Sequence, residues 1–255
     1  MVTAPGDQKI TYTTMSVDQS EAFNLAYESA LSEVMSQLGK DYPAYIGGKP
    51  RTVALPRFED RSPADANLLV GRFEECGQAE ADASVAAAQS AFQSWSHTRW
   101  QERVAILRNA ADIIRERKFE MSAWLTVEAG KPRLEAMGEV EEAADLIEIY
   151  CSQMEQHKGY VIRLNQLSPQ EVNHSVLRPY GVWAVISPFN FPVALLTGMI
   201  AGALVAGNTV VFKPSENTPL SGLNVYGCLR DAGIPDGAVN VVTGRGNDIG
   251  EALSG

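Results

Sequence analysis

The chain has 255 residues, of which 45% are hydrophobic and 20% are charged, close to the averages for folded globular proteins. This composition argues against a disordered, collagen-like or disulfide-stapled chain, and the length allows one large domain or two small ones. The net charge of −10 repels phosphate backbones, and no run of Lys or Arg forms a basic stripe. We therefore expect no nucleic-acid partner.

Cysteine usage and apolar runs bear on location. Cys76, Cys151 and Cys228 are widely spaced, without a C-x-x-C pair or a nearby His, which favours reduced thiols and argues against a metal site. The N-terminus has no basic start followed by an apolar run, so no secretory signal is expected. The most apolar stretch, Pro192 to Ala206, is shorter than the roughly 20 residues of a membrane span. We expect a cytoplasmic protein that does not enter the membrane.

The first predicted element is an amphipathic helix. Apolar residues recur at helical spacing from Phe23 to Leu38, with Ser20 placed to cap the start and Gly39 to end the helix. From Tyr42 to Gly77 the chain is punctuated by Gly and Pro between short apolar runs, which predicts short strands and turns.

A long helical region follows, from Asp82 to about Gln156. It is rich in Ala, Glu and Leu and is broken clearly only around residues 94–98 and at Gly130–Pro132, so three helices are predicted. The last helix carries an acidic run, for which a solvated face is favoured over a substrate or metal site. Its members are Glu139, Glu141, Glu142, Asp145 and Glu148.

Two β segments come next, Tyr160–Leu164 and Val172–Arg178, on either side of a turn at Ser168–Gln170. This pattern predicts a β-hairpin. A projecting hairpin would offer an unpaired edge to a neighbouring subunit, and a hairpin folded back onto its own domain is equally consistent with the sequence.

The last part of the chain alternates strands with helices. Strands are predicted over 181–187, 209–213 and 238–243, with helices over 192–206 and 219–233 between them. Thr218 can cap the second helix, and Gly198 and Gly202 would let the first helix approach the sheet closely. Short links between such elements predict right-handed parallel crossovers. The expected fold is α/β, with an open parallel Rossmann-like sheet covered by helices.

Ligands of open α/β sheets bind beyond the carboxyl ends of the strands, where helix N-termini present unpaired N–H groups. Three polar or glycine-containing segments fall at these positions, and they are residues 188–191, 213–216 and 244–246. Together they favour a binding site, because Lys and Glu can hydrogen-bond ribose hydroxyls and an Asn amide can donate to an oxyanion.

Each segment also has an ordinary explanation. Asn190 can cap the helix that follows it, Lys213 can be an exposed charge at a strand end, and Gly244 and Gly246 can form a simple turn. The run from Gly244 to Gly250 has one residue too many for the usual dinucleotide fingerprint. The glycines alone are therefore weak evidence for a nucleotide.

Three longer segments give the sequence a specific resemblance. They are Ile186–Pro192, Ala206–Glu216, and Ala232–Pro235 with Val239–Gly244. In these segments the chain resembles the aldehyde dehydrogenase family, and the likeness extends from about Tyr45 to Gly255 and includes Glu128–Pro132. Within the family, the helical lead before residue 42 and the segment 191–200 are most similar to the branch that oxidises L-glutamate gamma-semialdehyde.

The resemblance implies an oxidoreductase in which a thiolate attacks an aldehyde and a hydride passes to NAD, with NADP not excluded. By matching position, Asn190 is implied as the catalytic side-chain donor to the oxyanion, and Phe191 as a substrate contact. The implied cofactor-binding residues are Lys213 and Glu216 at the adenosine ribose, Ile186 and Ser187 along the cleft, and Gly246 near the adenine. No metal is implied.

The resemblance also divides the chain into four parts: a helical lead over 1–44, strands and long helices of the cofactor-binding domain over 45–158, an oligomerisation hairpin over 159–178, and the first βαβαβ part of a dinucleotide-binding domain over 179–255. The nucleophilic Cys and the Glu of the family are expected beyond Gly255, and none of the three cysteines matches the nucleophile's motif. We therefore expect the polypeptide alone to be inactive.

The expected partners are an aldehyde substrate and either a complementary C-terminal half or further copies of the chain. The alternative is a non-catalytic nucleotide-binding or interaction module that keeps the fold.

Overall fold

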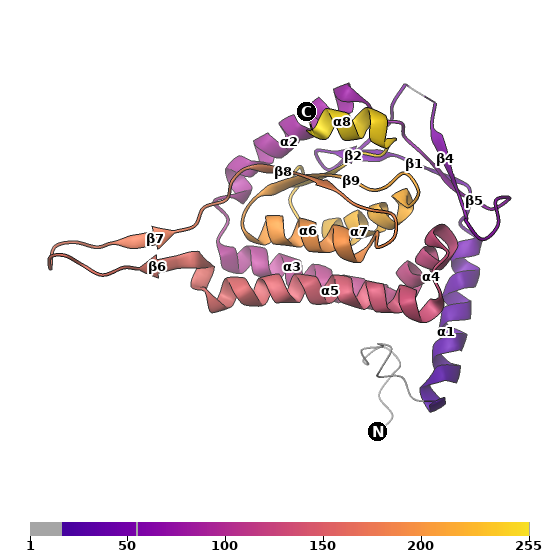
Figure 1. Cartoon of the computed structure of the whole chain (residues 1–255), viewed down its shortest axis with the longest axis horizontal. Coiled ribbons are helices and arrows are strands. Elements are labelled where there is room, and N and C mark those ends of the chain that lie inside the picture. The colour runs from indigo at the N-terminus through magenta and orange to yellow at the C-terminus, as the bar shows by residue number, and fades with distance from the viewer. Residues whose placement is uncertain (1–16, 55, 255) are drawn as a thin grey trace.

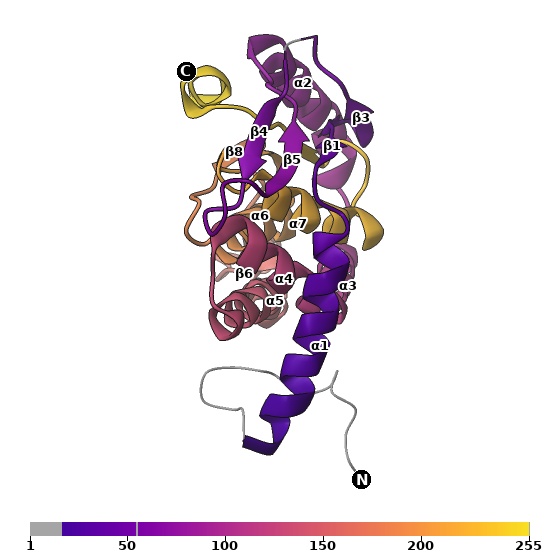
Figure 2. The same ribbon diagram turned by 90° about the vertical axis from the view of Figure 1, so that its right-hand side faces the viewer.

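The computed structural model describes residues 17–54 and 56–254. The first described element is helix α1 (Val17–Met35), which lies against α4 at one end of the molecule (Figures 1 and 2). The predicted cap Ser20 is inside α1 rather than before it. The helix ends at Met35, before the predicted terminator Gly39, which lies in the turn that follows with a φ of +77° and donates its N–H to the Val70 carbonyl.

Short strands follow, as predicted. They are β1 (Lys40–Tyr42), β2 (Ala44–Ile46), β3 (Lys49–Arg51), β4 (Phe58–Arg61) and β5 (Leu69–Phe73). Strands β1, β5 and β4 form a small sheet in that order, with β1 parallel and β4 antiparallel to β5. This small sheet packs its aromatic residues together, because the Phe73 ring stacks on Tyr42 and contacts Phe58.

The helical region contains four helices, not the three predicted. They are α2 (Gln78–Trp95), α3 (Trp100–Glu116), α4 (Lys118–Ala129) and α5 (Arg133–Gln156). Helices α3 and α4 are separated at Arg117, whose ψ of 10° is not helical and whose guanidinium pairs with Asp231 at 2.6 Å. No Gly or Pro marks this break, so the pattern did not reveal it. The predicted break at Gly130 is confirmed, because its φ of +70° ends α4.

The larger sheet has five strands in the order β3-β2-β10-β9-β8. Its parallel part is β8 (Val182–Ile186), β9 (Thr209–Lys213) and β10 (Val239–Val241), connected by α6 (Ala194–Val205) and α7 (Pro219–Asp231). The predicted βαβαβ unit is confirmed. The prediction of a wholly parallel sheet was wrong, because β2 pairs antiparallel with β10 and β3 pairs antiparallel with β2.

The β2–β3 hairpin explains this mixed edge. Gly47 and Gly48 form its two-residue turn with φ values of +61° and +75°, which suits the twist of a tight hairpin. Two three-residue strands joined in this way extend the sheet without a helical crossover. The sheet therefore combines strands from the early and late parts of the sequence.

Helices cover both faces of the large sheet. Helices α6 and α7 lie on one face and α2 on the other, and α3 and α5 form an outer layer against α6 and α7 (Figure 1). Gly198 and Gly202 of α6 have the packing role expected of them, but they face α5. A Cβ atom on Gly198 would lie 3.0 Å from Leu146, and one on Gly202 would lie 3.6 Å from Tyr150. The close approach is therefore between two helices.

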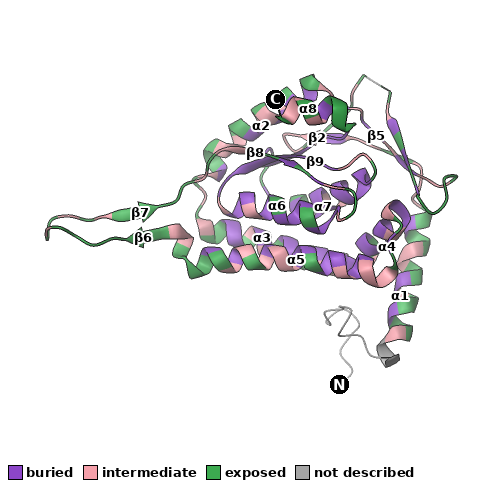
Figure 3. Ribbon diagram, viewed as in Figure 1, coloured by how far each residue is buried: buried purple, intermediate pink, exposed green. Residues whose placement is uncertain are grey.

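The buried core occupies the space between these layers, whereas the hairpin projects into solvent (Figure 3). The hairpin consists of β6 (Val161–Arg163) and β7 (His174–Val176), after the short turn η1 (Lys158–Tyr160). Strand β6 pairs with β7 alone among the described residues. The projecting arrangement is therefore the one observed. In the described ranges, no helix is both long and apolar enough to cross a membrane.

Candidate functional site

The parallel strands β8, β9 and β10 end at one edge of the large sheet. Ile186 at the end of β8 is in register with Lys213 at the end of β9, and the N–H of Ser187 donates to the Lys213 carbonyl at 3.2 Å. Phe212 of β9 is likewise in register with Val241 of β10. The segments that follow these strands are therefore neighbours, as the sequence predicts for a ligand-binding edge.

Lys213, Glu216 and Gly246 meet at this edge. The Nζ atom of Lys213 lies 3.6 Å from Oε2 of Glu216 and donates to the Pro214 carbonyl at 2.9 Å. The same Glu216 oxygen accepts the backbone N–H of Gly246 at 3.2 Å. Lys213 is only 2% exposed, so it is not a solvated strand-end charge. Burial lowers the pKa of Lys213, and the Glu216 carboxylate opposes that shift.

The two glycines after β10 differ in what the chain requires of them. Gly244 has a φ of +144°, and a Cβ there would lie 3.0 Å from Ile249 and 3.1 Å from the Cys76 carbonyl oxygen. At Gly246 the nearest atom to a Cβ would be the Glu216 carboxylate at 3.9 Å. Packing within the described chain therefore accounts for glycine at 244 and leaves open space at 246.

Ile186 and Ser187 extend the edge toward β8. Ile186 is 47% exposed at the strand end, and Ser187 is buried. The Ser187 Oγ atom has no hydrogen-bond partner within the described residues. Because a buried hydroxyl without a partner is unfavourable, this atom fits a position where a bound ligand supplies a polar group.

Asn190 lies on the segment between β8 and α6 and is exposed. It does not cap α6, because the Glu139 carboxylate accepts the N–H groups of Val193 at 2.8 Å and Ala194 at 3.2 Å. The Asn190 side chain makes no hydrogen bond within residues 17–54 and 56–254. The capping role that the sequence allowed is therefore filled by another residue, and the amide is available at the edge.

Glu139 and Lys131 contact the segment between β8 and α6 from the interior of the molecule. The sequence did not identify these two residues as functional. Lys131 Nζ lies 2.5 Å from Glu139 and 3.8 Å from the centroid of the Phe191 ring. Because Glu139 also caps α6, the pair fixes both the helix start and the ring beside Asn190. The chain between β8 and α6 is thus held by buried charges.

The solvated face predicted for the acidic run was therefore wrong for two of its members. Glu139 is buried against α6, and Glu141 is buried with its carboxylate 3.3 Å from Lys118. Glu142 is exposed as predicted. A signal was present in the sequence, because Glu139 stands three or four residues from the apolar Ala136 and Ala143 and so shares their helix face.

Glu128 is a second buried carboxylate that the sequence did not assign. It accepts the N–H groups of Leu220 at 2.6 Å and Ser221 at 2.8 Å, and so caps α7 in place of the predicted Thr218. Its neighbour in β4 is Asp60, also buried. Burial and the adjacent charge raise the pKa of Asp60 to about 9, and burial raises the pKa of Glu128.

The three cysteines are free thiols and all are buried. Burial raises the pKa of Cys76 and Cys151 to about 12 and that of Cys228 to about 11. A thiol in such an environment is a poor nucleophile, because the thiolate is the reactive form. Over the described residues, no group of three or more His, Cys, Asp or Glu side chains is arranged to hold a metal ion.

Comparison with known proteins identifies the class to which this fold and edge belong. The model of the aldehyde dehydrogenase family matches residues 52–255, so the chain belongs to that family. Among curated relatives, it is 41% identical over 234 residues to 1-pyrroline-5-carboxylate dehydrogenase 1 of Halalkalibacterium halodurans, covering 91% of this chain and 45% of the relative. A 1-pyrroline-5-carboxylate dehydrogenase of Bacillus mycoides is 40% identical over the same shares of the two chains.

Solved structures give the same result. A 1-pyrroline-5-carboxylate dehydrogenase from Thermus, crystallised with bound NAD, superposes with a TM-score of 0.88 at 35% identity, over 99% of this chain and 48% of that one. Proline utilization A of Bdellovibrio bacteriovorus superposes with a TM-score of 0.89 at 31% identity, over 99% of this chain and 26% of that one. The chain thus spans about half the length of the curated relatives it matches.

Proposed function

We propose that this chain is the N-terminal portion of an NAD-dependent aldehyde dehydrogenase that oxidises L-glutamate gamma-semialdehyde to L-glutamate. The relatives named 1-pyrroline-5-carboxylate dehydrogenase support the substrate, since they are about 40% identical over 91% of the chain. The observation that carries the proposal is the meeting of Lys213, Glu216 and Gly246 at the carboxyl edge of the parallel strands.

The residues at this edge fit a dinucleotide. A Lys donor beside a Glu acceptor matches the two neighbouring hydroxyls of a ribose, and the open space at Gly246 admits a ligand close to the backbone. The unpartnered hydroxyl of Ser187 offers a further polar contact. The Glu216 carboxylate would repel a 2′-phosphate, which supports NAD over NADP.

NAD, when bound, accepts a hydride from the substrate carbon. Asn190 is exposed at the edge without a competing hydrogen bond, and its amide would donate to the oxygen on which negative charge develops. Removing one such donor typically raises the barrier by about 3–4 kcal/mol. Phe191, held against Lys131, would contact the substrate from the same segment.

None of the three buried cysteines suits the role of nucleophile, so we propose that the reactive thiolate comes from a complementary C-terminal portion. The 255-residue polypeptide alone would then bind cofactor without oxidising aldehyde.

The projecting hairpin is proposed to pair with another copy of the chain, because its strands leave an edge unpaired among the described residues. The three free thiols favour a cytoplasmic location.

The proposal is tested by expressing the chain together with the C-terminal portion of the Thermus relative. We expect NADH to form from L-glutamate gamma-semialdehyde in the mixture and not with either part alone. Asn190→Ala in the mixture should lower kcat by about 100- to 1,000-fold while NAD binding persists. If a folded complex binds NAD and forms no NADH, the chain is a nucleotide-binding module. If the chain and the complex both fail to bind NAD, the cofactor assignment is wrong.

A further inference from the structure

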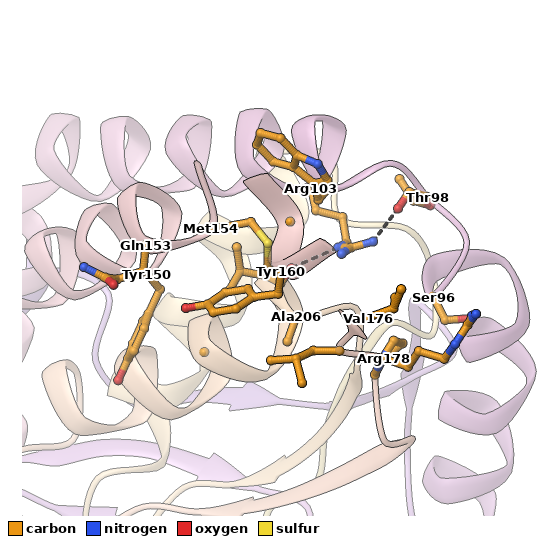
Figure 4. Close-up of a pocket in the computed structure, with 16 residues that line it drawn as sticks. Ser96, Thr98, Arg103, Tyr150, Gln153, Met154, Tyr160, Val176, Arg178 and Ala206 are labelled. Carbon is orange, nitrogen blue, oxygen red and sulfur yellow. Dashed lines mark hydrogen bonds between the residues drawn. The ribbon is translucent and has the colours of Figure 1, made fainter. Parts of the chain in front are cut away.

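A cavity lies at the base of the hairpin, away from the proposed cofactor edge (Figure 4). It has a volume of about 600 Å³ and lies between the start of α3, the ends of α5 and α6, the turn η1 and residues 176–179, which lead from β7 toward β8. Val205 and Ala206, which line it, stand at the far end of α6 from Asn190. A helix of this length spans about 18 Å, so the two places are separate. We call this cavity the hairpin-base pocket.

The pocket is positively charged within an acidic chain. Its lining contains Arg103 and Arg178 and no Asp or Glu among the described residues. Arg178 is exposed and has no ion-pair partner in the described ranges. The charge of this lining is therefore opposite in sign to the net charge of −10 of the chain.

Arg103 is the buried member of this pair. It is 7% exposed, and its guanidinium donates through Nε to the Val205 carbonyl at 3.0 Å and through Nη1 to the Thr98 carbonyl (Figure 4). These carbonyls satisfy two nitrogens, but no carboxylate of the described residues neutralises the charge. Burial accordingly lowers the pKa of Arg103. The third nitrogen, Nη2, makes no hydrogen bond within the described chain.

Aromatic side chains complete the pocket. Tyr150 and Tyr160 lie on its wall together with Met154 (Figure 4). Trp100 packs directly on Gly159, where a Cβ would lie 2.3 Å from the indole. Aromatic faces favour a flat apolar group, and guanidinium groups favour a carboxylate that they can contact with two donors. The volume is in the range of pockets that hold small organic molecules.

We propose that the hairpin-base pocket binds a small planar carboxylate, with the carboxylate at Arg103 and Arg178 and the apolar body against Tyr150 and Tyr160. The ligand supplies the negative charge that Arg103 lacks, and its apolar body packs against the aromatic wall. This site shares no residue with the cofactor edge, and the two should therefore fill independently.

Benzoate is the probe, with benzamide and acetate as matched controls that lack the charge and the ring respectively. Titration calorimetry of the chain should show that benzoate binds at least about tenfold more tightly than either control. Saturating NAD should leave benzoate affinity unchanged, since the cofactor edge is elsewhere. Equal affinity for the three probes, or displacement of benzoate by NAD, would overturn the proposal.

Arg178→Gln locates the site. Arg178 is exposed and makes no ion pair in the described chain, so this variant should fold as the parent does and lose benzoate affinity by about tenfold or more. Arg163→Gln makes the same change on exposed strand β6, outside the pocket, and should bind benzoate as the parent does. Equal benzoate affinity in both variants would refute the site. If instead both controls bind weakly and a peptide ending in a free carboxylate outcompetes benzoate, the occupant is a chain terminus and not a small molecule.

Discussion

Lys213 and Glu216 are joined across 3.6 Å at the end of β9, and the carboxylate oxygen that faces Lys213 Nζ also accepts the backbone N–H of Gly246. This one oxygen links the end of β9 to the segment that follows β10. The relationship explains how residues thirty positions apart can present a donor, an acceptor and open backbone to one elongated ligand.

Neutralising Glu216 should weaken cofactor binding. In Glu216→Gln the amide keeps the shape of the side chain but loses the charge that strengthens hydrogen bonds to ribose hydroxyls, so the Kd for NAD should rise about tenfold. Titration calorimetry of the chain measures this Kd. Glu142→Gln removes the same charge from an exposed position on α5 and should leave it unchanged. Equal Kd values for Glu216→Gln and the parent would remove Glu216 from the cofactor site.

A methyl group at Gly246 should affect binding without affecting folding. The nearest protein atom to that methyl is 3.9 Å away. The free energy of unfolding of Gly246→Ala should therefore differ from that of the parent by no more than about 0.5 kcal/mol. The methyl would occupy the space proposed for the adenine end, and the Kd for NAD should rise. Gly227→Ala on α7, also in open space, is the control and should bind NAD normally. A destabilised Gly246→Ala protein would show that glycine at 246 serves the fold.

The fold followed from the sequence wherever local pattern and global packing agreed. The strand at 209–213 and the start of α7 at Pro219 were predicted correctly. A β-branched run favours a strand, and a Pro in the first turn favours a helix start, whatever the rest of the chain does. The antiparallel β2–β3 edge was missed because three-residue strands carry too little pattern. The break at Arg117 was missed because no Gly or Pro marks it in the sequence.

The candidate site divides in the same way. Position after a strand drew attention to the segments that contain Lys213, Glu216 and Gly246, because parallel strands end at a common edge, and the family resemblance supplied their individual roles. The charges beneath the edge were not selected. Glu139 and Glu128 each cap a helix from a different part of the sequence, and such a pairing is visible only after the helices are packed.

Removing the Glu139 carboxylate should destabilise the chain strongly. Glu139→Ala would leave Lys131 buried without its close partner and expose the first N–H groups of α6, which should lower the free energy of unfolding by about 3–5 kcal/mol. Urea denaturation measures the change. Glu135→Ala removes the more exposed partner of Lys131, whose carboxylate lies 3.6 Å from Nζ, and should lower the free energy of unfolding by about 0–1 kcal/mol. If Glu139→Ala does not fold, Glu139→Gln keeps the acceptor and should fold with intermediate stability. Similar losses of free energy of unfolding in Glu135→Ala and Glu139→Ala would contradict the role of Glu139 in capping α6.

The Asp60–Glu128 pair should make stability depend on pH. Both carboxyls are buried, and Asp60 Oδ2 has no hydrogen-bond partner within the described residues. Burial first, and then the Glu128 charge, favour the protonated form of Asp60 in the folded chain. Because the folded pKa of Asp60 is raised to about 9, the folded chain holds a proton that the unfolded chain has released above about pH 4. The stabilising effect of the proton that Asp60 retains in the folded chain is therefore complete below about pH 4 and is lost as pH rises through about 9.

Asp60→Asn tests this dependence, because an amide imitates the protonated carboxyl at every pH. The urea midpoint of the parent should fall between about pH 5 and about pH 9, and the midpoint of Asp60→Asn should fall less over the same interval. Asp112→Asn, at an exposed position on α3, should follow the parent curve. Parallel curves for the parent and Asp60→Asn would mean that Asp60 does not retain a proton in the folded chain.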